Sequence, residues 1–391
     1  MFCLNIVNNF KTQGQWQNLS VVATLSAKNE LSLKNFISNI MLALVKHYKG
    51  VVVMLLKTVM FVVVASSVLF ANDTTSKWIR PAKVPQPKDN ILTPQRIELG
   101  RLLYFDKRLS RSKKISCATC HHPEHGWSDE HPTSKAVGYH GRVGPRNSPT
   151  ILNSAYQLNQ FWDGRVKTLE EQASGPIQAD VEMNMPFNIL IPQLNKIEGY
   201  KKLFAKAYPK SKGVITKEYL TKAIASFERT VVSDDAPFDK YIKGDTKAIS
   251  QKAKRGFELF KGKARCVFCH DGFNFTDGSF HNIGLNDGEL KGKELGRYLL
   301  KKRASWYGAM KTPTLRDVAK SYPYFHDGSV KTLKEATVIC AKGGRYEHNV
   351  RNKSLTLSDR NLDETEIDEL VEFMKTLTSP NKNIKIPTKF P

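Results

Sequence analysis

Two motifs of the form C-x-x-C-H constrain this chain more than any other feature of its sequence. They are Cys117-Ala-Thr-Cys120-His121 and Cys266-Val-Phe-Cys269-His270. A c-type haem is attached when two thiols add across its vinyl groups, and the x-x spacing places both sulfurs on one turn. The histidine that follows then directs its imidazole to the iron. The motifs therefore predict two covalently bound c-type haems, with His121 and His270 as proximal iron ligands.

Two other interpretations of these motifs are weaker. A thioredoxin-like redox pair does not require the adjacent histidine, and a zinc site would need a second cysteine pair or an H-x-x-x-H segment nearby. Of the remaining cysteines, Cys3 lies in the N-terminal leader and Cys340 stands alone. No disulfide framework is therefore predicted.

The chain is strongly basic, with a formal net charge of +23 at pH 7. This charge favours acidic partners or an anionic membrane surface, although a solvated surface tuned for solubility would have the same composition. The basic residues are scattered along the chain. Because no helix-turn-helix, zinc-finger or aromatic RNA-binding motif accompanies them, nucleic acid is not expected as a partner.

Residues 1–71 are expected to be a leader. Residues 51–71 place Lys57 before an apolar run and then small residues, which is the order of a secretory signal cleaved after Ala71. The alternative is an uncleaved membrane anchor. Residues 1–50 are unlike an export signal, so the true start is expected at an internal methionine such as Met54. Haem attachment to C-x-x-C-H takes place outside the bacterial cytoplasmic membrane, and both signals predict a periplasmic protein.

The rest of the chain repeats one plan: a helix, a Gly- or Lys-rich turn, a C-x-x-C-H motif and a long loop. Apolar residues at 3.6-residue spacing predict helices over 93–105, 168–173, 189–207, 216–231, 250–260, 332–341 and 363–377. No alternation of apolar and polar residues is long enough for a substantial sheet. The predicted fold class is all-α with little strand.

A break at Asp234–Pro237 is a predicted domain boundary. The chain then divides into an extended lead-in (72–90), an N-terminal haem domain (91–236), a C-terminal haem domain (237–380) and a tail (381–391). Each haem motif is followed by a loop long enough to indicate a functional role.

Further segments carry a family resemblance over residues 91 to 378. They are GPRNSPT (144–150), FWDGR (161–165), GPIQADVEM (175–183), SFERT (226–230), DGSFHNIGL (277–285), KTPTLR (311–316) and YPYFHDGS (322–329). In combination they resemble the bacterial di-haem cytochrome c peroxidase and MauG superfamily. The resemblance implies two cytochrome c-like domains with one haem each and a calcium ion at their interface. It also implies that hydrogen peroxide reacts at the N-terminal haem, while the C-terminal haem collects electrons from a small donor such as a cytochrome c.

The resemblance also assigns roles to individual residues. Glu182 is the distal acid/base beside the peroxidatic iron, Trp162 is an electron bridge between the haems, and His326 matches a position needed for peroxidase function. The calcium ligands implied by the resemblance are Asn147, Ser321 and Pro323. The family usually has Thr where Ser321 stands, but the expected ligand is a main-chain oxygen. The chemistry supports Glu182 independently, because cleaving O–O requires a proton to move between the two oxygens.

Two positions depart from the peroxidase pattern. The distal ligand of the electron-entry haem is Met in the peroxidases and Tyr in MauG, and the aligned residue here is Cys340. A thiolate would lower the potential of that haem, whereas methionine raises it. Alternatively, Cys340 is only a small buried residue, or Met310 supplies the ligand.

The second departure lies in the loop 122–150. The peroxidases place a histidine there that blocks the peroxidatic iron until the other haem is reduced. The aligned residue is Tyr139, and a one-residue shift would let His140 serve as the distal ligand. The surrounding sequence is closer to MauG, in which the iron is open. The remaining loop histidines, His122, His125 and His131, are expected to face solvent.

The predicted function is that of a periplasmic peroxidase that reduces hydrogen peroxide with electrons from a small c-type cytochrome. A MauG-like enzyme that oxidises residues of a partner protein is the first alternative, which Cys340 and the loop favour. A non-catalytic di-haem electron carrier is the second, although a carrier needs no distal acid such as Glu182. Homodimers are common in the family, but no residue pattern here predicts one.

Overall fold

The computed structural model describes residues 2–12, 15–25, 38–39, 76–129, 137–285, 294–346, 352–380 and 384–391. The chain forms two compact units, Met1–Thr74 and Thr75–Pro391. In the first, strands β1 (Phe2–Thr12) and β2 (Gln15–Leu25) pair as antiparallel neighbours. This hairpin was not predicted, because neither segment alternates apolar and polar residues along its whole length. The predicted signal or anchor segment, 51–71, is outside the described residues.

The second unit is mostly helical, which confirms the predicted fold class. Its α-helices are α4 (Pro94–Phe105), α5 (Cys117–Cys120), α6 (Leu169–Gln178), α7 (Phe187–Leu194), α8 (Glu198–Ala207), α9 (Lys217–Glu228), α10 (Pro237–Ile242), α11 (Gln251–Lys261), α12 (Leu333–Ala341) and α13 (Glu364–Lys375). Strands β3 (Phe280–His281) and β4 (Met310–Lys311) form a short antiparallel pair. Among the described residues, no helix combines the length and apolarity that a membrane span requires.

The predicted helix bounds hold in part: α6 continues to Gln178 instead of ending at 173, and α10 was not predicted. Thr93 caps α4 by accepting a hydrogen bond from the Arg96 N–H at 3.2 Å. However, the segment 189–207, predicted as one helix, forms two helices, α7 and α8. Asn195 ends α7, because its side-chain Nδ2 donates to Ile191 O at 3.0 Å and to Ile215 O at 2.9 Å. The Asn195 side chain also accepts from the Ile215 N–H at 3.0 Å, so it ties the end of α7 to the segment before α9.

Two helix pairs repeat one kind of close packing. In the pair α4 and α9, a Cβ added to Gly100 would lie 1.9 Å from Ala223 O and 2.9 Å from Phe227 Cβ. In the pair α11 and α13, a Cβ added to Gly256 would lie 1.9 Å from Glu369 O and 2.9 Å from Phe373 Cβ. Only glycine permits these backbones to approach so closely. The shared packing gives the predicted repeat of one helical plan a structural basis.

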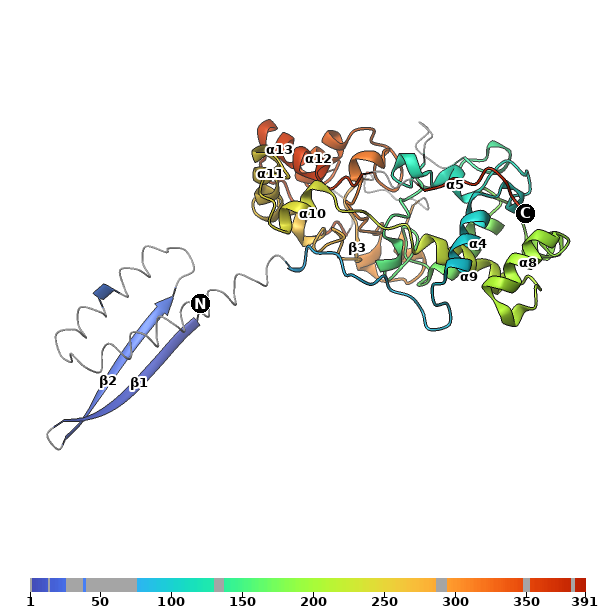
Figure 1. Cartoon of the computed structure of the whole chain (residues 1–391). Coiled ribbons are helices and arrows are strands. Elements are labelled where there is room, and N and C mark those ends of the chain that lie inside the picture. Colours follow the sequence, from blue (N-terminus) through green and yellow to red (C-terminus); the bar gives the residue numbers. More distant parts are fainter. Residues whose placement is uncertain are drawn as a thin grey trace. The chain divides into compact units, whose positions relative to one another are not determined.

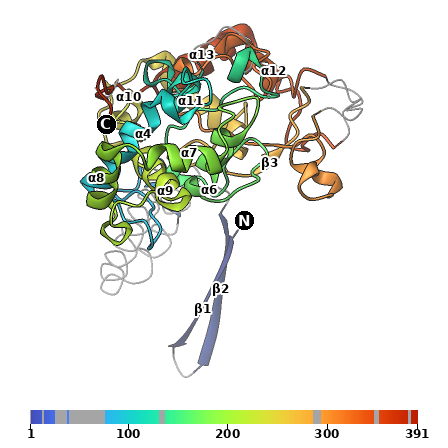
Figure 2. The same ribbon diagram turned by 90° about the vertical axis from the view of Figure 1, so that its right-hand side faces the viewer.

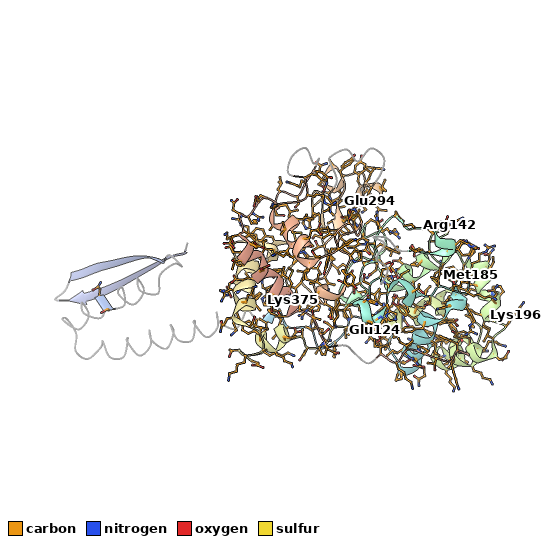
Figure 3. The ribbon with its side chains drawn as sticks, turned by 90° about the horizontal axis from the view of Figure 1, so that it is seen from above. Glu124, Arg142, Met185, Lys196, Glu294 and Lys375 are labelled. Atoms are coloured by element: carbon orange, nitrogen blue, oxygen red, sulfur yellow. The ribbon has the colours of Figure 1, made fainter. Side chains whose placement is uncertain are left out.

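Each helix pair has its own hydrophobic core. The first core is built from α4, α6, α7, α8 and α9, and includes Leu103, Tyr200 and Phe204. The second is built from α10, α11 and α13, and includes Phe257, Phe260 and Phe373. Figures 1 and 2 show the two groups of helices. In Figure 3, Lys375 of α13 and Lys196, beside α7, lie at opposite ends of this unit. The second unit thus has two halves, each carrying one C-x-x-C-H motif.

The lead-in and the C-terminal residues each connect to a half distant in sequence. Trp78 is 2% exposed and belongs to the second core. Its ring centroid lies 6.1, 5.5 and 5.0 Å from those of Phe238, Phe257 and Phe275. At the other end of the lead-in, Asn90 Nδ2 donates to Glu170 Oε1 at 2.8 Å in the first half. The last residue returns to the first half, where Pro391 O accepts from Arg108 Nη1 at 2.8 Å.

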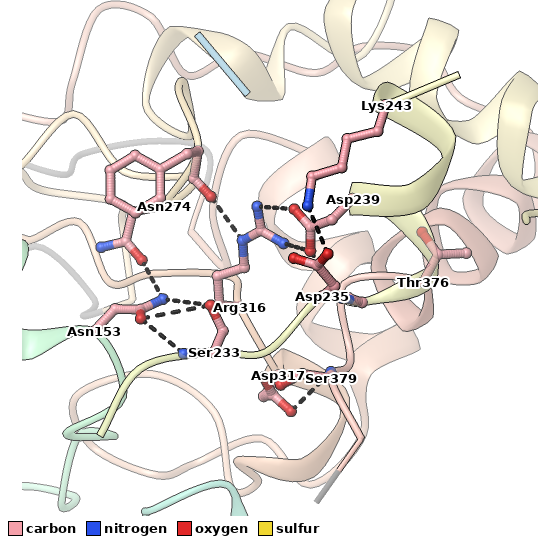
Figure 4. Close-up of polar contacts among 12 residues, drawn as sticks. Asn153, Ser233, Asp235, Asp239, Lys243, Asn274, Arg316, Asp317, Thr376 and Ser379 are labelled. Atoms are coloured by element: carbon pink, nitrogen blue, oxygen red, sulfur yellow. Dashed lines mark hydrogen bonds and ion pairs between the residues drawn. The ribbon is translucent and has the colours of Figure 1, made fainter. Parts of the chain in front are cut away.

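A buried polar network joins the halves where the chain passes from one to the other (Figure 4). Asn153 Nδ2 donates to Ser233 Oγ at 3.1 Å and to Asn274 Oδ1 at 3.0 Å. In the same network, Arg316 is 1% exposed and pairs with both carboxylate oxygens of Asp239, at 2.7 and 2.8 Å. Because every charge in this pair is matched, the network holds the halves in register without leaving a buried charge unpaired.

We expect Gly256→Ala to destabilise the protein by about 1–3 kcal/mol, since its new methyl would clash with Glu369 O and the helices must separate. Chemical denaturation of the haem-loaded protein measures the loss. Lys252→Ala, at an exposed position of the same helix, is the matched control and should change stability by less than about 0.5 kcal/mol. An increase in stability in Gly256→Ala, as helix propensity alone predicts, would contradict this packing argument.

Candidate functional site

The second C-x-x-C-H motif follows α11 and forms the 3₁₀ turn η6 (Cys266–Phe268). The His270 main-chain N–H donates to Cys266 O at 2.9 Å and closes the turn. On the imidazole, Nδ1 lies 2.8 Å from Phe275 O. Because a carbonyl can only accept, Nδ1 carries the proton and Nε2 keeps its lone pair. The motif therefore offers two free thiols and one imidazole nitrogen able to bind iron.

The first motif has the same local form on α5. The His121 N–H donates to Cys117 O at 3.0 Å, and the Tyr104 hydroxyl donates to His121 O at 3.0 Å. Desolvation lowers the pKa of His121 to about 4, so its imidazole is neutral at neutral pH. Among the described residues, its buried Nδ1 has no hydrogen-bond partner. A neutral, desolvated imidazole beside two free thiols fits an iron ligand of a c-type haem.

A cavity of about 240 Å³ extends from the second motif toward the first half. Cys266, Cys269 and His270 form part of its wall, as do apolar residues such as Phe260, Leu333 and Met374. An apolar cavity next to two thiols and an imidazole nitrogen is suited to a macrocycle that must be shielded from water. The residues present therefore fit covalent haem at this motif.

Trp162 also lines this cavity, on the side of the first half. Its indole Nε1 donates to Asn147 O at 2.8 Å, and the Asn147 N–H donates to His326 O at 2.7 Å. The rings of Trp162 and His326 meet edge to face with centroids 6.3 Å apart. The structure thus brings together three predicted site residues from segments far apart in the sequence.

The predicted calcium ligands lie in the same place. Asn147, Ser321 and Pro323 all line the cavity. The Asn147 Nδ2 donates to Pro323 O at 2.6 Å, whereas Asn147 Oδ1 is buried without a hydrogen-bond donor. A buried carbonyl oxygen with no donor, next to main-chain carbonyls, fits a hard cation that prefers oxygen ligands, such as Ca²⁺.

Glu182 lies in the turn between α6 and α7, on the side of the first motif. Burial raises the pKa of its carboxyl, while the charge of Arg165 lowers it. Burial also raises the pKa of Cys120 to about 12, and the charges of Asp129 and Glu182 add to this shift. Glu182 is therefore close enough to influence the first motif electrostatically. Its half-buried position suits a carboxyl that exchanges a proton.

The loop after the first motif packs against Glu182 through Tyr139. The Tyr139 N–H donates to Glu182 O at 2.7 Å, and Tyr139 is half-buried. His140 is exposed and has a φ of 54°.

The other loop histidines were predicted to face solvent. His122 and His125 are instead half-buried, with ring centroids 5.5 Å apart. The reason is that His122 Nδ1 accepts from the Glu124 N–H at 3.3 Å, which holds its ring against the loop. His131 is not among the described residues.

Both candidates for a distal ligand of the second haem face the cavity. Cys340, in α12, and Met310, in β4, line it together with Cys269. Cys340 is accessible within the cavity but shielded from bulk solvent. This desolvation, with a smaller contribution from the Cys269 thiol, raises the pKa of Cys340 to about 12. The geometry therefore keeps both ligand alternatives open.

Two buried charged residues near the site were not predicted from the sequence. Lys311 is 9% exposed and lines the cavity, and its main-chain N–H donates to Trp162 O at 2.7 Å. Glu228, in α9, is 5% exposed, and its Oε2 has no hydrogen-bond partner. Burial raises the pKa of Glu228 to about 8. The segments KTPTLR and SFERT were noted only for their resemblance, because burial of a charged side chain has no signal in a single sequence.

Two haem-attachment motifs on two helical halves define a di-haem c-type oxidoreductase. The family model for di-haem cytochrome c peroxidase matches residues 94–247, and the cytochrome c model matches residues 253–378. The chain is 42% identical over 312 residues to the methylamine utilization protein MauG of Methylorubrum extorquens, covering 80% of this chain and 86% of that one. It is 36% identical over 311 residues to the cytochrome c551 peroxidase of Pseudomonas aeruginosa, covering 78% and 85%. The chain belongs to the di-haem cytochrome c peroxidase and MauG family, and two c-type haems follow from that membership.

Solved structures agree with this assignment. A MauG-like protein associated with microbial copper homeostasis has a TM-score of 0.71 at 30% identity, covering 77% of this chain and 95% of that chain. The diheme peroxidase BthA of Burkholderia thailandensis has a TM-score of 0.65 at 22% identity, covering 75% and 88%, and shares the fold. Relatives named for peroxidase and for MauG thus have the same architecture.

We expect the stability of this protein to fall between about pH 5 and pH 8 because of Glu228. An acid whose folded-state pKa is raised stays protonated in the fold while the unfolded chain ionises, so stability is lost as pH rises toward about 8. Glu228→Gln removes this cost, and its stability relative to wild type should rise by up to roughly 3 kcal/mol from pH 5 to pH 8. Denaturation at several pH values measures the trend. Glu218→Gln, exposed on the same helix, is the control, and an equal trend in both variants would contradict the assignment to Glu228.

Proposed function

We propose that this protein reduces hydrogen peroxide to water with electrons from a small c-type cytochrome. The observation that carries the proposal is the position of one segment, FWDGR. Its Trp162 lines the cavity of the second motif, and the charge of its Arg165 acts on Glu182 beside the first. One stretch of five residues therefore connects the second motif, where electrons would enter, with the acid Glu182 beside the first motif.

Glu182 moves the proton in this reaction. Reducing one peroxide molecule to two waters takes two electrons and two protons, and cleaving O–O requires a proton on the departing oxygen. Burial raises the pKa of the Glu182 carboxyl, which favours its protonated form as a proton donor to that oxygen. When bound, the two haems supply the iron that binds peroxide and the store of electrons.

Trp162 carries electrons between the two halves, and its neighbours keep the indole in place. The hydrogen bond to Asn147 O and the edge contact with His326 restrict its rotation. His326 is buried, so it acts by positioning Trp162 and is not in contact with bulk solvent. A calcium ion bound through Asn147 Oδ1 and the Ser321 and Pro323 carbonyls would stiffen the same junction.

The proposed protein has two haem domains and is exported. The first haem domain comprises residues 91–236 and the second 237–380, with a lead-in at 72–90 and a tail at 381–391. The leader exports the protein to the periplasm as a signal peptide or keeps it at the membrane as an anchor. The donor is a small protein, and the net positive charge of this chain favours an acidic one. A homodimer is an open expectation from the family.

Oxidation of residues on a partner protein is the second candidate. The specific observation that favours it is the loop beside Glu182, where the half-buried residue is Tyr139 and the histidine, His140, is exposed. With His140 exposed to solvent, the iron of the first haem would be open without prior reduction. The 42% identity to a MauG, against 36% to a cytochrome c551 peroxidase, points the same way.

The deciding experiment is steady-state peroxide consumption by purified protein with two haems, using a reduced small cytochrome c. Fast turnover establishes the peroxidase, and dependence on prior one-electron reduction adds that a distal ligand such as His140 gates the iron. Absence of turnover with several donors contradicts the peroxidase proposal. Peroxide-dependent oxidation of a partner protein would then establish the second candidate, whereas reversible electron transfer alone would establish a carrier.

We expect Glu182→Gln to keep both haems yet lower peroxide turnover by about 10²-fold or more, because the amide cannot exchange the proton. Stopped-flow or steady-state assays measure the loss. The control is Glu124→Gln, an exposed acid after the first motif (Figure 3), which should leave turnover unchanged. Turnover within a factor of two of wild type in Glu182→Gln would remove this carboxyl from the mechanism.

We expect Cys340→Met to raise the midpoint potential of the second haem, since a thioether ligand raises the potential that a thiolate lowers. Redox titration followed by absorbance measures the shift. Met310→Leu, the matched change at the other candidate ligand in the cavity, should leave the potential unchanged. If Met310→Leu shifts the potential and Cys340→Met does not, Met310 is the ligand.

A further inference from the structure

Lys311 is a buried cation with only neutral partners. It is 9% exposed, and its Nζ donates to Asn159 O at 3.0 Å and to Gln157 Oε1. Among the residues that the structure describes, no carboxylate pairs with it. Burial alone lowers the pKa of its ammonium to about 7. A buried ammonium without a counter-charge is costly, so this position is expected to gain a negative partner.

The position of Lys311 indicates what that partner is. Lys311 lines the same cavity as Cys266, Cys269 and His270. It also borders the segment of Trp162, because its main-chain N–H donates to Trp162 O at 2.7 Å. A haem attached at this motif brings two propionate carboxylates, and these are the only anions that the established cofactor adds to the cavity. A carboxylate within reach of a desolvated ammonium forms a strong charge-assisted hydrogen bond.

We propose that Lys311 binds a propionate of the haem attached at Cys266 and Cys269 and thereby sets the potential of that haem. A positive charge next to the haem stabilises the reduced form, which carries one positive charge fewer than the oxidised form. Pairing also holds the propionate ionised, so its protonation does not change with pH near neutrality. The proposal rests on haem attachment and not on peroxide turnover, so it can fail while the proposed function stands, and the reverse.

A structural role for Lys311 is the competing explanation. Its Nζ reaches Gln157 and Asn159 of the first half, so the side chain could only connect the two halves. Such a role would affect stability but not the potential of one haem. Midpoint potentials therefore separate the two explanations, and they do not depend on activity.

The experiment is a redox titration of purified di-haem protein from pH 6 to pH 8, for wild type, Lys311→Met and Lys311→Arg. Near-infrared magnetic circular dichroism assigns each wave, because it distinguishes haems by their axial ligands. We expect Lys311→Met to lower the midpoint of the second haem and to make it depend on pH. Lys311→Arg, which keeps the charge, should stay close to wild type. Lys240→Met, an exposed lysine of α10, is the control for a general change in charge and should shift neither midpoint.

An unchanged second-haem midpoint in Lys311→Met overturns the proposal, as does a shift confined to the first haem. If Lys311→Met does not fold with two haems, Lys311→Gln replaces it, because the amide can keep the bonds to Gln157 and Asn159. Resonance Raman spectra of wild type and Lys311→Arg give an independent measurement. The proposal requires the propionate-bending band of one haem to change with the geometry of the cation, and identical bands overturn it.

Discussion

The hydrogen bond from the Trp162 indole to the Asn147 carbonyl holds the junction on which the rest of the site depends. Through this bond of 2.8 Å, the segment that carries Arg165 toward Glu182 is tied to the segment that contacts His326. Trp162 belongs to the first half and His326 to the second, so their edge contact is also a contact between the halves. The buried network of Asn153, Asn274 and Arg316 supports the same junction from another side, and Figure 4 shows how its members converge.

Buried charged residues differ between the structural framework and the surroundings of the haem motifs. In the scaffold, buried ions are paired: Arg316 with Asp239 at 2.7 Å, and Arg229 with Glu170 at 2.8 Å. Near the haem motifs, neither Lys311 nor Glu228 forms an ion pair among the described residues, although the charge of Arg229 acts on Glu228. A buried charged group without an ion-pair partner destabilises the fold. Such groups are found mainly where a cofactor or a reaction uses them.

By the sequence resemblance, this chain combines features of the peroxidases and of the MauG proteins of its family. The acid, the indole and the calcium-ligand positions are common to the resemblance as a whole. By contrast, Tyr139 beside Glu182 and Cys340 in the cavity depart from the peroxidase pattern. In the proposed function, both positions concern iron ligation, which would determine the potentials of the haems and whether peroxide can approach an oxidised iron. The two candidate functions therefore differ at the ligands of the haems more than at the protein framework.

The sequence by itself determined the chemistry of attachment and the fold class. A c-type haem needs two thiols and an imidazole at fixed short spacing, so the two C-x-x-C-H motifs are readable without a structure. Helices α4, α9, α11 and α13 were likewise predictable, because apolar periodicity and N-caps such as Thr93 are local signals. Only the tertiary structure could bring Asn147, Trp162 and His326 into one cluster, break the segment 189–207 at Asn195, and bury Lys311 and Glu228. Those outcomes depend on contacts between residues distant in the chain. Neither the burial of a charged side chain nor the absence of a counter-charge can therefore be predicted from the sequence alone.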